Sequence, residues 1–446
     1  MAVDKLLIRQ SGPLRGAVAL DGAKNAVLPI MAACLLTQEP SVIENVPHVT
    51  DVVTMIEILR RLGVAVEFSG ERLSIHPDRY AGTVAPYDLV SRMRASICVL
   101  GPLLARHGKA QVSMPGGCVI GPRPIDLHLK GLQALGAAFT IEHGYIVGTA
   151  DELRGARVHL SGAFGSSVLA TGNVMMAATL AKGRTVIENA ACEPEVVDLA
   201  NCLIGMDAHI EGHGSPVIRV DGVPQLRGAR YRIIPDRIEA GTLMIATAMV
   251  GGDLTIEGAQ AEHLGAVIDK LSEANVPIEK RNGSLRVRTN RPTRAVDVTT
   301  LPFPGFPTDL QAQMMALMAV SRGVSVLTEK VYPERFMHIS ELSRMGAAIT
   351  REGSSAIVKG VDRLSGAPVS APDLRASAAL LLAGMAAENQ TELAGLEHLE
   401  RGYQHLEAKL VRLGAKIQRI STENPGRAGL GAAGSGHMPG ARNLEP

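Results

Sequence analysis

Apolar and polar residues follow a pattern that returns about every 70 residues along the chain. Each unit carries a helix-like segment with one apolar face, which ends at Gly or a close substitute and leads into a strand-like pattern. These ends are Gly63, Gly136, Asp207, Asn275, Gly346 and Gly414. Gly and Asn tolerate the left-handed conformation that closes many helices. The pattern therefore predicts six amphipathic helices, one in each unit.

A second kind of helix precedes each amphipathic one and is apolar on nearly every side. These segments are rich in Ala, Met and Leu and cover residues 26–36, 95–105, 173–181, 242–250, 311–320 and 376–386. A helix that lacks a polar face is typically buried. Each unit is therefore predicted to contain a strand, a buried helix, a second strand, an amphipathic helix, and one or two further strands.

Units of this size are too long for a solenoid, whose repeats have about 20–45 residues. We expect instead that three units close into one domain and that the chain forms two similar α/β domains. The cleft between such domains is the expected site for a small molecule. Residues 423–446 are rich in Gly, Ala and Pro without periodicity, and we interpret them as a disordered tail.

Composition narrows the classes of function. Of the 446 residues, 46% are apolar and 20% are charged, as in globular proteins. Aromatic residues make up only 3% and Trp is absent, which disfavours a surface that stacks nucleic-acid bases. Lys and Arg number 45 against 44 Asp and Glu, so the net charge is +1. An anionic ligand therefore has to be held by a local cluster of cations.

Neither a membrane span nor a disulfide framework is indicated. The apolar runs fall short of the roughly 18 residues that cross a bilayer. The chain does not open with a basic segment followed by an apolar one, so we expect a cytoplasmic protein. The five cysteines include no CxxC pair, and no zinc site is expected. Four of them are interpreted as buried and inert: Cys34, Cys98, Cys192 and Cys202.

Two segments have the composition of an anion site or a nucleophile site. Lys24 and Asn25 open a buried helix, where backbone N–H groups and a lysine attract an anion; the alternative is an exposed Lys beside a capping Asn. Cys118 lies in a loop with three glycines and three prolines within residues 114–128. Because Arg123 follows five residues later, the thiol is either an activated acid or nucleophile, or an inert core cysteine.

Four arginines and one aspartate complete the candidate chemistry. Arginine suits the bidentate binding of carboxylates and phosphates. Those that open helices or loops in different units are Arg94, Arg335, Arg375 and Arg401. Their equivalent placement would direct them toward a common cleft. Asp309, in Phe-Pro-Thr-Asp, is a general base or, as the residues alone favour, a helix-capping residue.

Together these motifs resemble the enolpyruvyl transferase superfamily, and within it the branch that acts on UDP-N-acetylglucosamine. The resemblance runs over residues 5–420. The motifs that carry it are Gly-Ala-Lys-Asn at 22–25, Pro-Gly-Gly-Cys-x-Ile-Gly-x-Arg-Pro at 115–124, Pro-Asp-Arg-Ile-Glu at 235–239, Phe-Pro-Thr-Asp at 306–309, Arg-Phe-Met-His at 335–338, Asp-Leu-Arg-Ala-Ser at 373–377 and Arg-Gly-Tyr at 401–403.

The resemblance implies two inside-out α/β barrel domains, each made of three βαβαββ repeats, with an active-site cleft between them. One domain would cover residues 22–232. The other would combine residues 1–21 with residues 233–422, so that two strands of the chain cross at a hinge.

The implied reaction transfers the enolpyruvyl group of phosphoenolpyruvate to the 3′-hydroxyl of UDP-N-acetylglucosamine with release of phosphate, the first committed step of peptidoglycan synthesis. Cys118 would protonate the methylene carbon of phosphoenolpyruvate and can form a covalent adduct, while Asp309 would accept the hydroxyl proton. Phosphoenolpyruvate would be bound by Lys24, Asn25, Arg123 and Arg401. The UDP-sugar would be bound by Arg94, Arg123, Pro124, Ile125, Asp126, Leu127, Ser167, Val168, Asp309 and Val331. Arg335 and Arg375 would support the cleft. No cofactor, metal, nucleic acid or membrane insertion is implied.

Three positions depart from the family pattern. Leu169 replaces the Gly of Ser-Val-Gly-Ala-Thr, Cys192 replaces an Arg, and Asp207 stands where the repeat has Gly. Two alternatives to the implied reaction stay open: the same chemistry on another nucleotide acceptor, and a non-catalytic relative that binds a UDP-sugar and regulates. The Pro-Gly-Gly-Cys loop argues against a shikimate-type acceptor.

Overall fold

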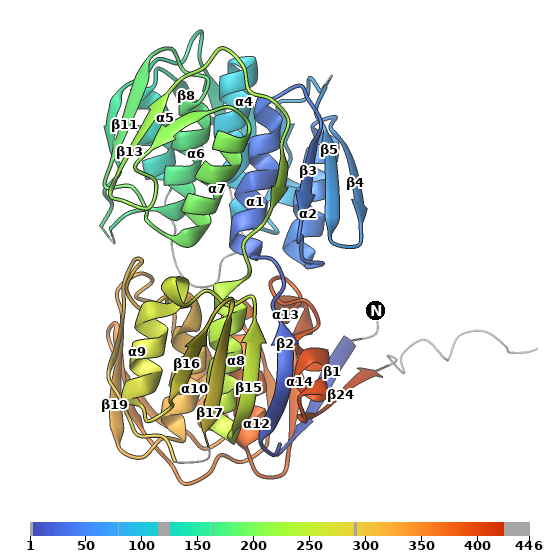
Figure 1. Cartoon of the computed structure of the whole chain (residues 1–446), viewed down its shortest axis with the longest axis vertical. Coiled ribbons are helices and arrows are strands. Elements are labelled where there is room, and N and C mark those ends of the chain that lie inside the picture. Colours follow the sequence, from blue (N-terminus) through green and yellow to red (C-terminus); the bar gives the residue numbers. More distant parts are fainter. Residues whose placement is uncertain (1–2, 79, 115–124, 164, 290–291, 423–446) are drawn as a thin grey trace, which may run out of the picture.

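The computed structural model describes residues 3–78, 80–114, 125–163, 165–289 and 292–422 (Figure 1). The described residues form two lobes, which lie one above the other along the long axis of the molecule in Figure 1. The first lobe contains the elements from α1 to β14, and the second contains β1, β2 and the elements from α8 to β24. The chain thus begins in the second lobe, builds the first lobe, and returns.

Six four-stranded sheets make up the β-structure of the described residues. In spatial order, those of the first lobe are β14 (Arg230–Arg232), β3 (Ser41–Glu44), β5 (Arg72–His76), β4 (Ala65–Ser69); β6 (Val84–Ala85), β7 (Lys109–Ser113), β9 (Tyr145–Thr149), β8 (Ala138–Glu142); and β10 (Arg157–His159), β11 (Arg184–Glu188), β13 (Val217–Asp221), β12 (His209–Glu211). Those of the second lobe are β16 (Ile278–Arg281), β17 (Ser284–Thr289), β15 (Gly252–Glu257), β2 (Leu14–Ala19); β18 (Val298–Thr300), β19 (Val324–Glu329), β21 (Ser355–Lys359), β20 (Ala348–Glu352); and β22 (Pro368–Ser370), β23 (Gln390–Ala394), β1 (Val3–Arg9), β24 (Lys416–Thr422).

All six sheets share one pairing scheme. In the sheet of β10 to β13, for example, β10 and β11 are parallel, whereas β13 is antiparallel to both β11 and β12. A parallel pair needs a crossover, and helices provide it between β6 and β7, β10 and β11, β18 and β19, and β22 and β23. In the other two sheets the outer parallel strand comes from a distant part of the chain: β14 pairs with β3, and β2 with β15. The six predicted βαβαββ units are therefore confirmed. Among the described residues the sheets stay separate and form no hydrogen-bonded closed barrel.

The buried helices lie inside each lobe and the sheets lie outside, as Figure 1 shows. The central helical segments are α1 (Lys24–Ala33) with η1 (Cys34–Leu36), η2 (Arg94–Val99) with α4 (Leu100–His107), α6 (Val168–Ala178), α8 (Arg237–Val250), η4 (Thr308–Leu310) with α10 (Gln311–Ala319), and α12 (Leu374–Ala386). The outer helices are α2 (Thr50–Arg61), α5 (Asp126–Ala134), α7 (Pro194–Gly205), α9 (Gly265–Glu273), α11 (His338–Arg344) and α14 (Leu406–Arg412), with the short α3 (Tyr87–Val90), α13 (Leu396–Leu399) and η3 (Ala261–Leu264).

The six predicted helix ends are confirmed by their backbone. Each has a positive φ: 94° at Gly63, 103° at Gly136, 72° at Asp207, 71° at Asn275, 89° at Gly346 and 108° at Gly414. Asp207 thus keeps the conformation of the glycine that it replaces. Asp and Asn visit this region more readily than other residues with a Cβ atom, so the departure at Asp207 does not change the fold.

Each lobe has its own hydrophobic core. One core extends from Ala23 to Ile233, and the other combines Leu6, Leu14 and Val18 with residues from Ile238 to Ala415. The chain passes between the lobes twice, side by side. The amide of Ala23 donates to the Ile234 carbonyl at 2.8 Å, and that of Asp236 donates to the Asp21 carbonyl at 2.9 Å.

A buried lysine holds this crossing point. Lys409 Nζ lies 2.7 Å from an Asp21 carboxylate oxygen and 2.5 Å from one of Glu239. The Asp21 amide also donates to Glu239 at 2.9 Å. One cation of the second lobe therefore ties the outgoing segment at Asp21 to the first turn of α8, where the chain has just returned.

Candidate active site

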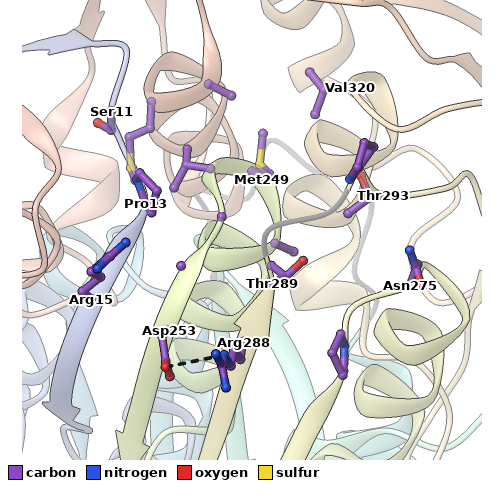
Figure 2. Close-up of a pocket in the computed structure, with 18 of the residues that line it drawn as sticks. Ser11, Pro13, Arg15, Met249, Asp253, Asn275, Arg288, Thr289, Thr293 and Val320 are labelled. Atoms are coloured by element: carbon purple, nitrogen blue, oxygen red, sulfur yellow. Dashed lines mark ion pairs between the residues drawn. The ribbon is translucent and has the colours of Figure 1, made fainter.

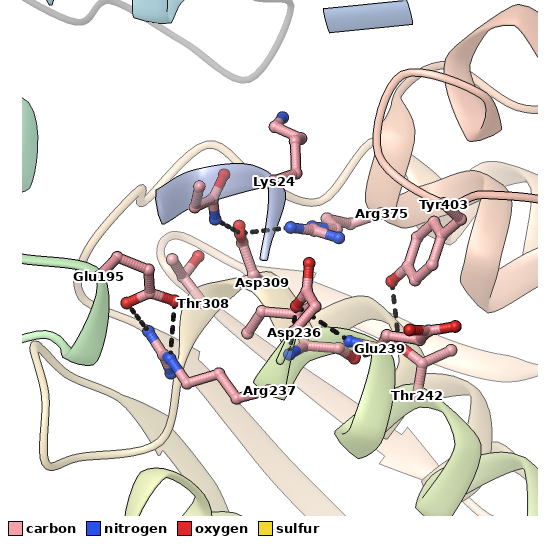
Figure 3. Close-up of polar contacts among 12 residues, drawn as sticks. Lys24, Glu195, Asp236, Arg237, Glu239, Thr242, Thr308, Asp309, Arg375 and Tyr403 are labelled. Atoms are coloured by element: carbon pink, nitrogen blue, oxygen red, sulfur yellow. Dashed lines mark hydrogen bonds and ion pairs between the residues drawn. The ribbon is translucent and has the colours of Figure 1, made fainter. Parts of the chain in front are cut away.

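Asp309 stands at the centre of a cluster that joins the two lobes (Figure 3). Its two carboxylate oxygens accept hydrogen bonds from Arg335 Nη1 at 2.8 Å and from Arg375 Nη2 at 2.7 Å. The side-chain amide of Asn25, at the start of α1 in the first lobe, donates to Asp309 at 3.3 Å. The arginine side chains are only 6% and 3% exposed, whereas that of Asp309 is 24% exposed. Four residues predicted for the site therefore meet, and the carboxylate keeps access to solvent.

These contacts determine the protonation state of Asp309. Burial alone raises the pKa of this carboxyl, but Arg375 and Arg335 outweigh burial and hold the pKa well below its ordinary value. The group is therefore ionised throughout the neutral range. Neither η4 nor α10 receives a side-chain cap at its start. The capping interpretation of Asp309 is therefore wrong, because its oxygens are directed at arginines instead.

A second carboxylate, Asp51, holds two more of the predicted cations. Lys24 Nζ lies 2.8 Å from one Asp51 oxygen, and Arg401 Nε lies 3.0 Å from the other. Asp51 belongs to the first turn of α2 and its side chain is only 3% exposed. Burial raises the pKa of Asp51, yet Lys24 and Arg401 lower it below the ordinary value. Lys24 belongs to the first lobe and Arg401 to the second, so this ion cluster also bridges the lobes.

A third bridge consists of the glutamates before and in the first turn of α7. Arg237, at the start of α8, makes a bidentate ion pair with Glu195 at 2.9 and 3.1 Å, and both side chains are at most 10% exposed. Glu193 accepts a hydrogen bond from the Phe303 amide at 3.3 Å. The interface between the lobes is thus polar and charged around Asp309 (Figure 3). Such an interface favours relative motion of the lobes more than an apolar one does.

Several polar groups support the cluster from the second lobe. The Arg375 guanidinium carbon lies 5.4 Å from the centre of the Tyr403 ring, within cation–π range. The Tyr403 hydroxyl lies 2.9 Å from that of Thr242 and accepts from the Gln313 amide at 3.2 Å. Gln313 also donates to the backbone carbonyl of Asp309 at 3.1 Å. Arg375 and Asp309 are therefore held in place by Tyr403, which belongs to the Arg-Gly-Tyr motif, and by Thr242 and Gln313, to which the sequence assigned no role.

The predicted UDP-sugar residues begin helices or end strands. Asp126 and Leu127 open α5 after Ile125, and Val168 opens α6, whose Ser167 hydroxyl accepts from the Ala170 amide at 3.3 Å. Arg94 begins η2, and Val331 follows β19. Helix starts provide free N–H groups for an anion. Cys118, Arg123 and Pro124 lie outside the described residues.

Two of the family departures lie beside the third bridge. Leu169 lines a small apolar cavity together with Cys98 and Glu195. Cys192 directly precedes Glu193, so the arginine of the family pattern is replaced at the edge of this bridge. The interpretation of the other cysteines as buried is confirmed for Cys34, Cys98 and Cys202, and burial raises the pKa of Cys34 and Cys98 to about 12. Cys192 is half-buried, and burial raises its pKa as well.

A wide cavity of 1390 Å³ lies elsewhere (Figure 2). It is lined by Met249 and Val250 at the end of α8 and by Met385 and Ala386 at the end of α12. The charged cluster lies at the other ends of the same helices. A helix of 14 residues such as α8 is about 21 Å long. We therefore assign the candidate active site to the charged interface and not to this cavity, whose lining includes none of the predicted site residues.

Among the described residues, no helix has the length and apolarity needed to cross a membrane. One functional residue that the sequence did not reveal is Asp51, which pairs with Arg401 across 350 positions of the chain. Its only local signal is an acid in the first turn of an amphipathic helix, where many helices carry one. The sequence pattern therefore could not distinguish Asp51 from an ordinary surface acid.

Solved structures share this architecture. The enolpyruvyl transferase NikO from Streptomyces tendae aligns with a TM-score of 0.85 and 25% identity, covering 95% of this chain and 100% of that chain. An EPSP synthase from Acinetobacter baumannii aligns with a TM-score of 0.72 at 18% identity, over 94% of this chain and 100% of that one, and so shares the fold. The architecture is that of the enolpyruvyl transferases.

Sequence comparison gives a narrower assignment. The family model described as EPSP synthase (3-phosphoshikimate 1-carboxyvinyltransferase) matches residues 8–410. Relatives named UDP-N-acetylglucosamine 1-carboxyvinyltransferase come from Caldanaerobacter subterraneus (53% identity over 90% of this chain and 95% of the relative) and Rhodospirillum centenum (51% over 94% and 99%). The chain belongs to the EPSP synthase family and, within it, to the UDP-N-acetylglucosamine 1-carboxyvinyltransferases.

Proposed function

We propose that the chain transfers the enolpyruvyl group of phosphoenolpyruvate to the 3′-hydroxyl of UDP-N-acetylglucosamine and releases phosphate, the first committed step of peptidoglycan synthesis. The observation that carries this proposal is the meeting of Asn25 with Asp309, Arg335 and Arg375 across the two lobes. The names of relatives at 51–53% identity support this choice of acceptor. We also propose that the compartment is the cytoplasm.

Phosphoenolpyruvate is bound by cations in this proposal. Lys24 and Arg401 each use one N–H group for Asp51, and both have further donors for the phosphate and carboxylate of the substrate. Arg123 joins them, and Asn25 lies nearby. Preorganised donors that face developing charge stabilise a tetrahedral intermediate without any cofactor. Asp51 keeps these two cations paired while the anion is absent.

Proton transfer is divided between two residues. Cys118 protonates the methylene carbon of phosphoenolpyruvate and can also bond covalently to it. Asp309 accepts the proton of the sugar hydroxyl, and its exposed fraction and ionised state support that role. Arg335 and Arg375 keep the pKa of Asp309 low, which makes the carboxylate a weak base. When substrate anions draw these arginines away, the pKa of Asp309 rises and the carboxylate accepts the proton more readily.

The UDP-sugar is held by the first lobe and by one segment of the second. Its contacts are Arg94, Arg123, Pro124, Ile125, Asp126, Leu127, Ser167, Val168, Asp309 and Val331. We also propose that residues 22–232 form one domain and that residues 1–21 with 233–422 form the other. The two separate cores and the paired crossing segments support this division.

The test is phosphate release from phosphoenolpyruvate with a panel of acceptors: UDP-N-acetylglucosamine, another UDP-sugar and 3-phosphoshikimate. We expect turnover with UDP-N-acetylglucosamine and its loss in Asp309→Asn, which keeps the shape of the side chain but removes the charge. A non-catalytic regulator would instead be stabilised against heat by UDP-N-acetylglucosamine without releasing phosphate. Turnover with another acceptor alone would establish the chemistry and refute the proposed substrate.

A further inference from the structure

Glu329 is a buried carboxylate that the proposed reaction does not use. It is the last residue of β19, and its parallel partner in β18 is Thr300. Its side chain is completely buried, and among the described residues it forms no ion pair with a cation. An ionised carboxylate in such a place is costly unless several donors surround it. Four groups donate hydrogen bonds to the Glu329 carboxylate, and their positions indicate its role.

One oxygen of Glu329 holds the segment that follows β19. Glu329 Oε1 accepts from the backbone amides of Val331 and Tyr332, each at 2.9 Å, and from the Thr300 hydroxyl at 2.5 Å. The same Thr300 hydroxyl accepts from the Lys330 amide at 3.0 Å. All three amides of residues 330–332 are therefore bound at the end of the strand pair. Val331 in this segment is predicted to contact the UDP-sugar.

The other oxygen of Glu329 reaches the charged cluster. Glu329 Oε2 accepts from the Thr308 hydroxyl at 2.8 Å. Thr308 directly precedes Asp309, and both residues are labelled in Figure 3. Arg335 Nη1 donates both to the Thr308 hydroxyl at 3.0 Å and to Asp309 at 2.8 Å. Because the Thr308 oxygen accepts from Arg335, its own proton points to Glu329. The hydrogen bonds thus run in one direction, from Arg335 through Thr308 to Glu329.

A cation–π contact also connects the segment 330–332 to the charged cluster around Asp309. The Arg335 guanidinium carbon lies 5.9 Å from the centre of the Tyr332 ring. The backbone of residues 330–332 is therefore held by Glu329, while a side chain of the same segment faces the arginine that binds Asp309. Connected hydrogen bonds of this kind polarise and stiffen one another. Two routes of contact therefore connect the segment to Asp309, one through Glu329 and Thr308 and one through Tyr332 and Arg335.

We propose that Glu329 is a positioning residue for the transfer reaction: it couples the segment 330–332 to Asp309 through Thr308 and Arg335. The acceptor sugar and the group that takes its proton are thereby placed by one buried carboxylate. This inference rests on the proposed function, because it concerns how the hydroxyl of UDP-N-acetylglucosamine is aligned with Asp309. Misplacing reacting groups by about 1 Å can cost two orders of magnitude in rate.

Two substitutions break the link at different atoms. Thr308→Val removes the hydroxyl and leaves every bond of residues 330–332 in place. Glu329→Gln keeps an oxygen for the Val331 and Tyr332 amides but presents an NH₂ group to Thr308. That group can only donate, so the hydrogen bond is reversed and the proton of the Thr308 hydroxyl loses its acceptor. Thr308→Ser restores the hydroxyl. Thr328→Val is the matched control, because Thr328 pairs with Ser355 at 2.9 Å outside this network.

The experiment measures kcat and KM for both substrates, with thermal unfolding as a check of folding. We expect kcat to fall about tenfold in Thr308→Val and in Glu329→Gln, while KM for UDP-N-acetylglucosamine stays within about twofold. Thr308→Ser and Thr328→Val should keep kcat within about twofold. The double variant Glu329→Gln/Thr308→Val should lose no more than the worse single variant, since both changes break one link.

The possible failures are distinguishable. An unmodified chain that does not turn over UDP-N-acetylglucosamine refutes the proposed function, and this inference with it. Turnover in the unmodified chain with equal kcat in Thr308→Val and Thr328→Val overturns the inference alone. Multiplied losses in the double variant also overturn it, because Glu329 and Thr308 would then act separately. If Glu329→Gln fails to fold, Thr308→Val against Thr308→Ser still decides.

Discussion

Asp51→Asn tests the idea that one buried acid keeps two substrate-binding cations in place. The change preserves size and removes the charge, so Lys24 and Arg401 lose the carboxylate that lies 2.8 and 3.0 Å from them. Removing one partner of a buried ion pair costs about 3–5 kcal/mol. Because the Arg401 side chain is 26% exposed, water compensates part of the loss, and we expect a cost near the lower end, about 3 kcal/mol.

The pH dependence of this cost has a definite sign. The pKa of Asp51 is lowered in the folded protein, so its contribution is present above the ordinary value of 3.8 and is lost as pH falls through the lower folded value. Urea unfolding followed by far-ultraviolet circular dichroism should therefore give the full difference at pH 7. The difference between the unmodified chain and Asp51→Asn should shrink below about pH 4.

An anionic ligand should have the opposite effect, because it stabilises the Asp51→Asn variant more than the unmodified chain. Two unpaired cations bind an anion more tightly than two that share a carboxylate, so inorganic phosphate should stabilise Asp51→Asn more than it stabilises the unmodified chain. Asp88→Asn is the control, because Asp88 is also an acid in a first helical turn but is exposed. We expect less than about 0.5 kcal/mol from it. A cost at Asp51 below 1 kcal/mol, with equal phosphate effects, would refute the reasoning.

Three further predictions follow from burial and charge. The epoxide fosfomycin, a thiol-reactive mimic of phosphoenolpyruvate, should label Cys118 and not Cys98, because burial raises the pKa of Cys98 to about 12; peptide mapping by mass spectrometry decides. Burial raises the pKa of Asp198 to about 6, so the folded protein holds a proton that the unfolded chain releases near pH 4. The free energy of unfolding should therefore fall as pH rises from 4 to 6. In urea unfolding, the unmodified chain should lose roughly 2–3 kcal/mol by pH 8 relative to Asp198→Asn. Arg401→Ala should raise KM for phosphoenolpyruvate by at least tenfold, from a lost charge-assisted pair of about 2 kcal/mol, while calorimetric binding of UDP-N-acetylglucosamine changes little.

Each of these predictions has its own contrary result. Label on Cys98, or label that persists in Cys118→Ser, would place the reactive thiol elsewhere. Parallel pH curves for the unmodified chain and Asp198→Asn would mean that Tyr231, whose hydroxyl donates to Asp198 at 2.6 Å, keeps the carboxylate as stable as in water. Equal losses of both ligands in Arg401→Ala would make Arg401 a structural residue that only serves Asp51.

The repeat architecture was predictable because it depends on local chemistry. Gly63 and its five counterparts need a left-handed backbone, and the adjacent buried helices lack a polar face. These signals lie within a few residues of the element that they specify. Even Asp207, which breaks the sequence pattern, keeps the backbone of the pattern. The same local signals therefore occur in all six units, and the substitution at Asp207 does not prevent the fold from being predicted.

The site was predictable only through its cations and the resemblance. Lys24 and Arg375 stand out as charges at the starts of otherwise apolar helices, and Arg401 is indicated by the Arg-Gly-Tyr motif. Asp51 and Glu329 do not, because the partners that give them meaning are distant along the chain: Arg401 for Asp51, and Thr300 and Thr308 for Glu329. The residues around Asp309 alone favoured a cap for the same reason. The role of such a carboxylate depends on partners that are distant in the sequence. The residues next to it do not reveal these partners.

The most direct test of the central claim is the identity of the product. The chain, incubated with phosphoenolpyruvate and UDP-N-acetylglucosamine, should release one phosphate for each new nucleotide sugar formed. Mass spectrometry and nuclear magnetic resonance should find the enolpyruvyl group as an ether on the 3′ oxygen of that sugar. Phosphate release that does not depend on UDP-N-acetylglucosamine, or an enolpyruvyl group found on 3-phosphoshikimate and not on the sugar, would contradict the account.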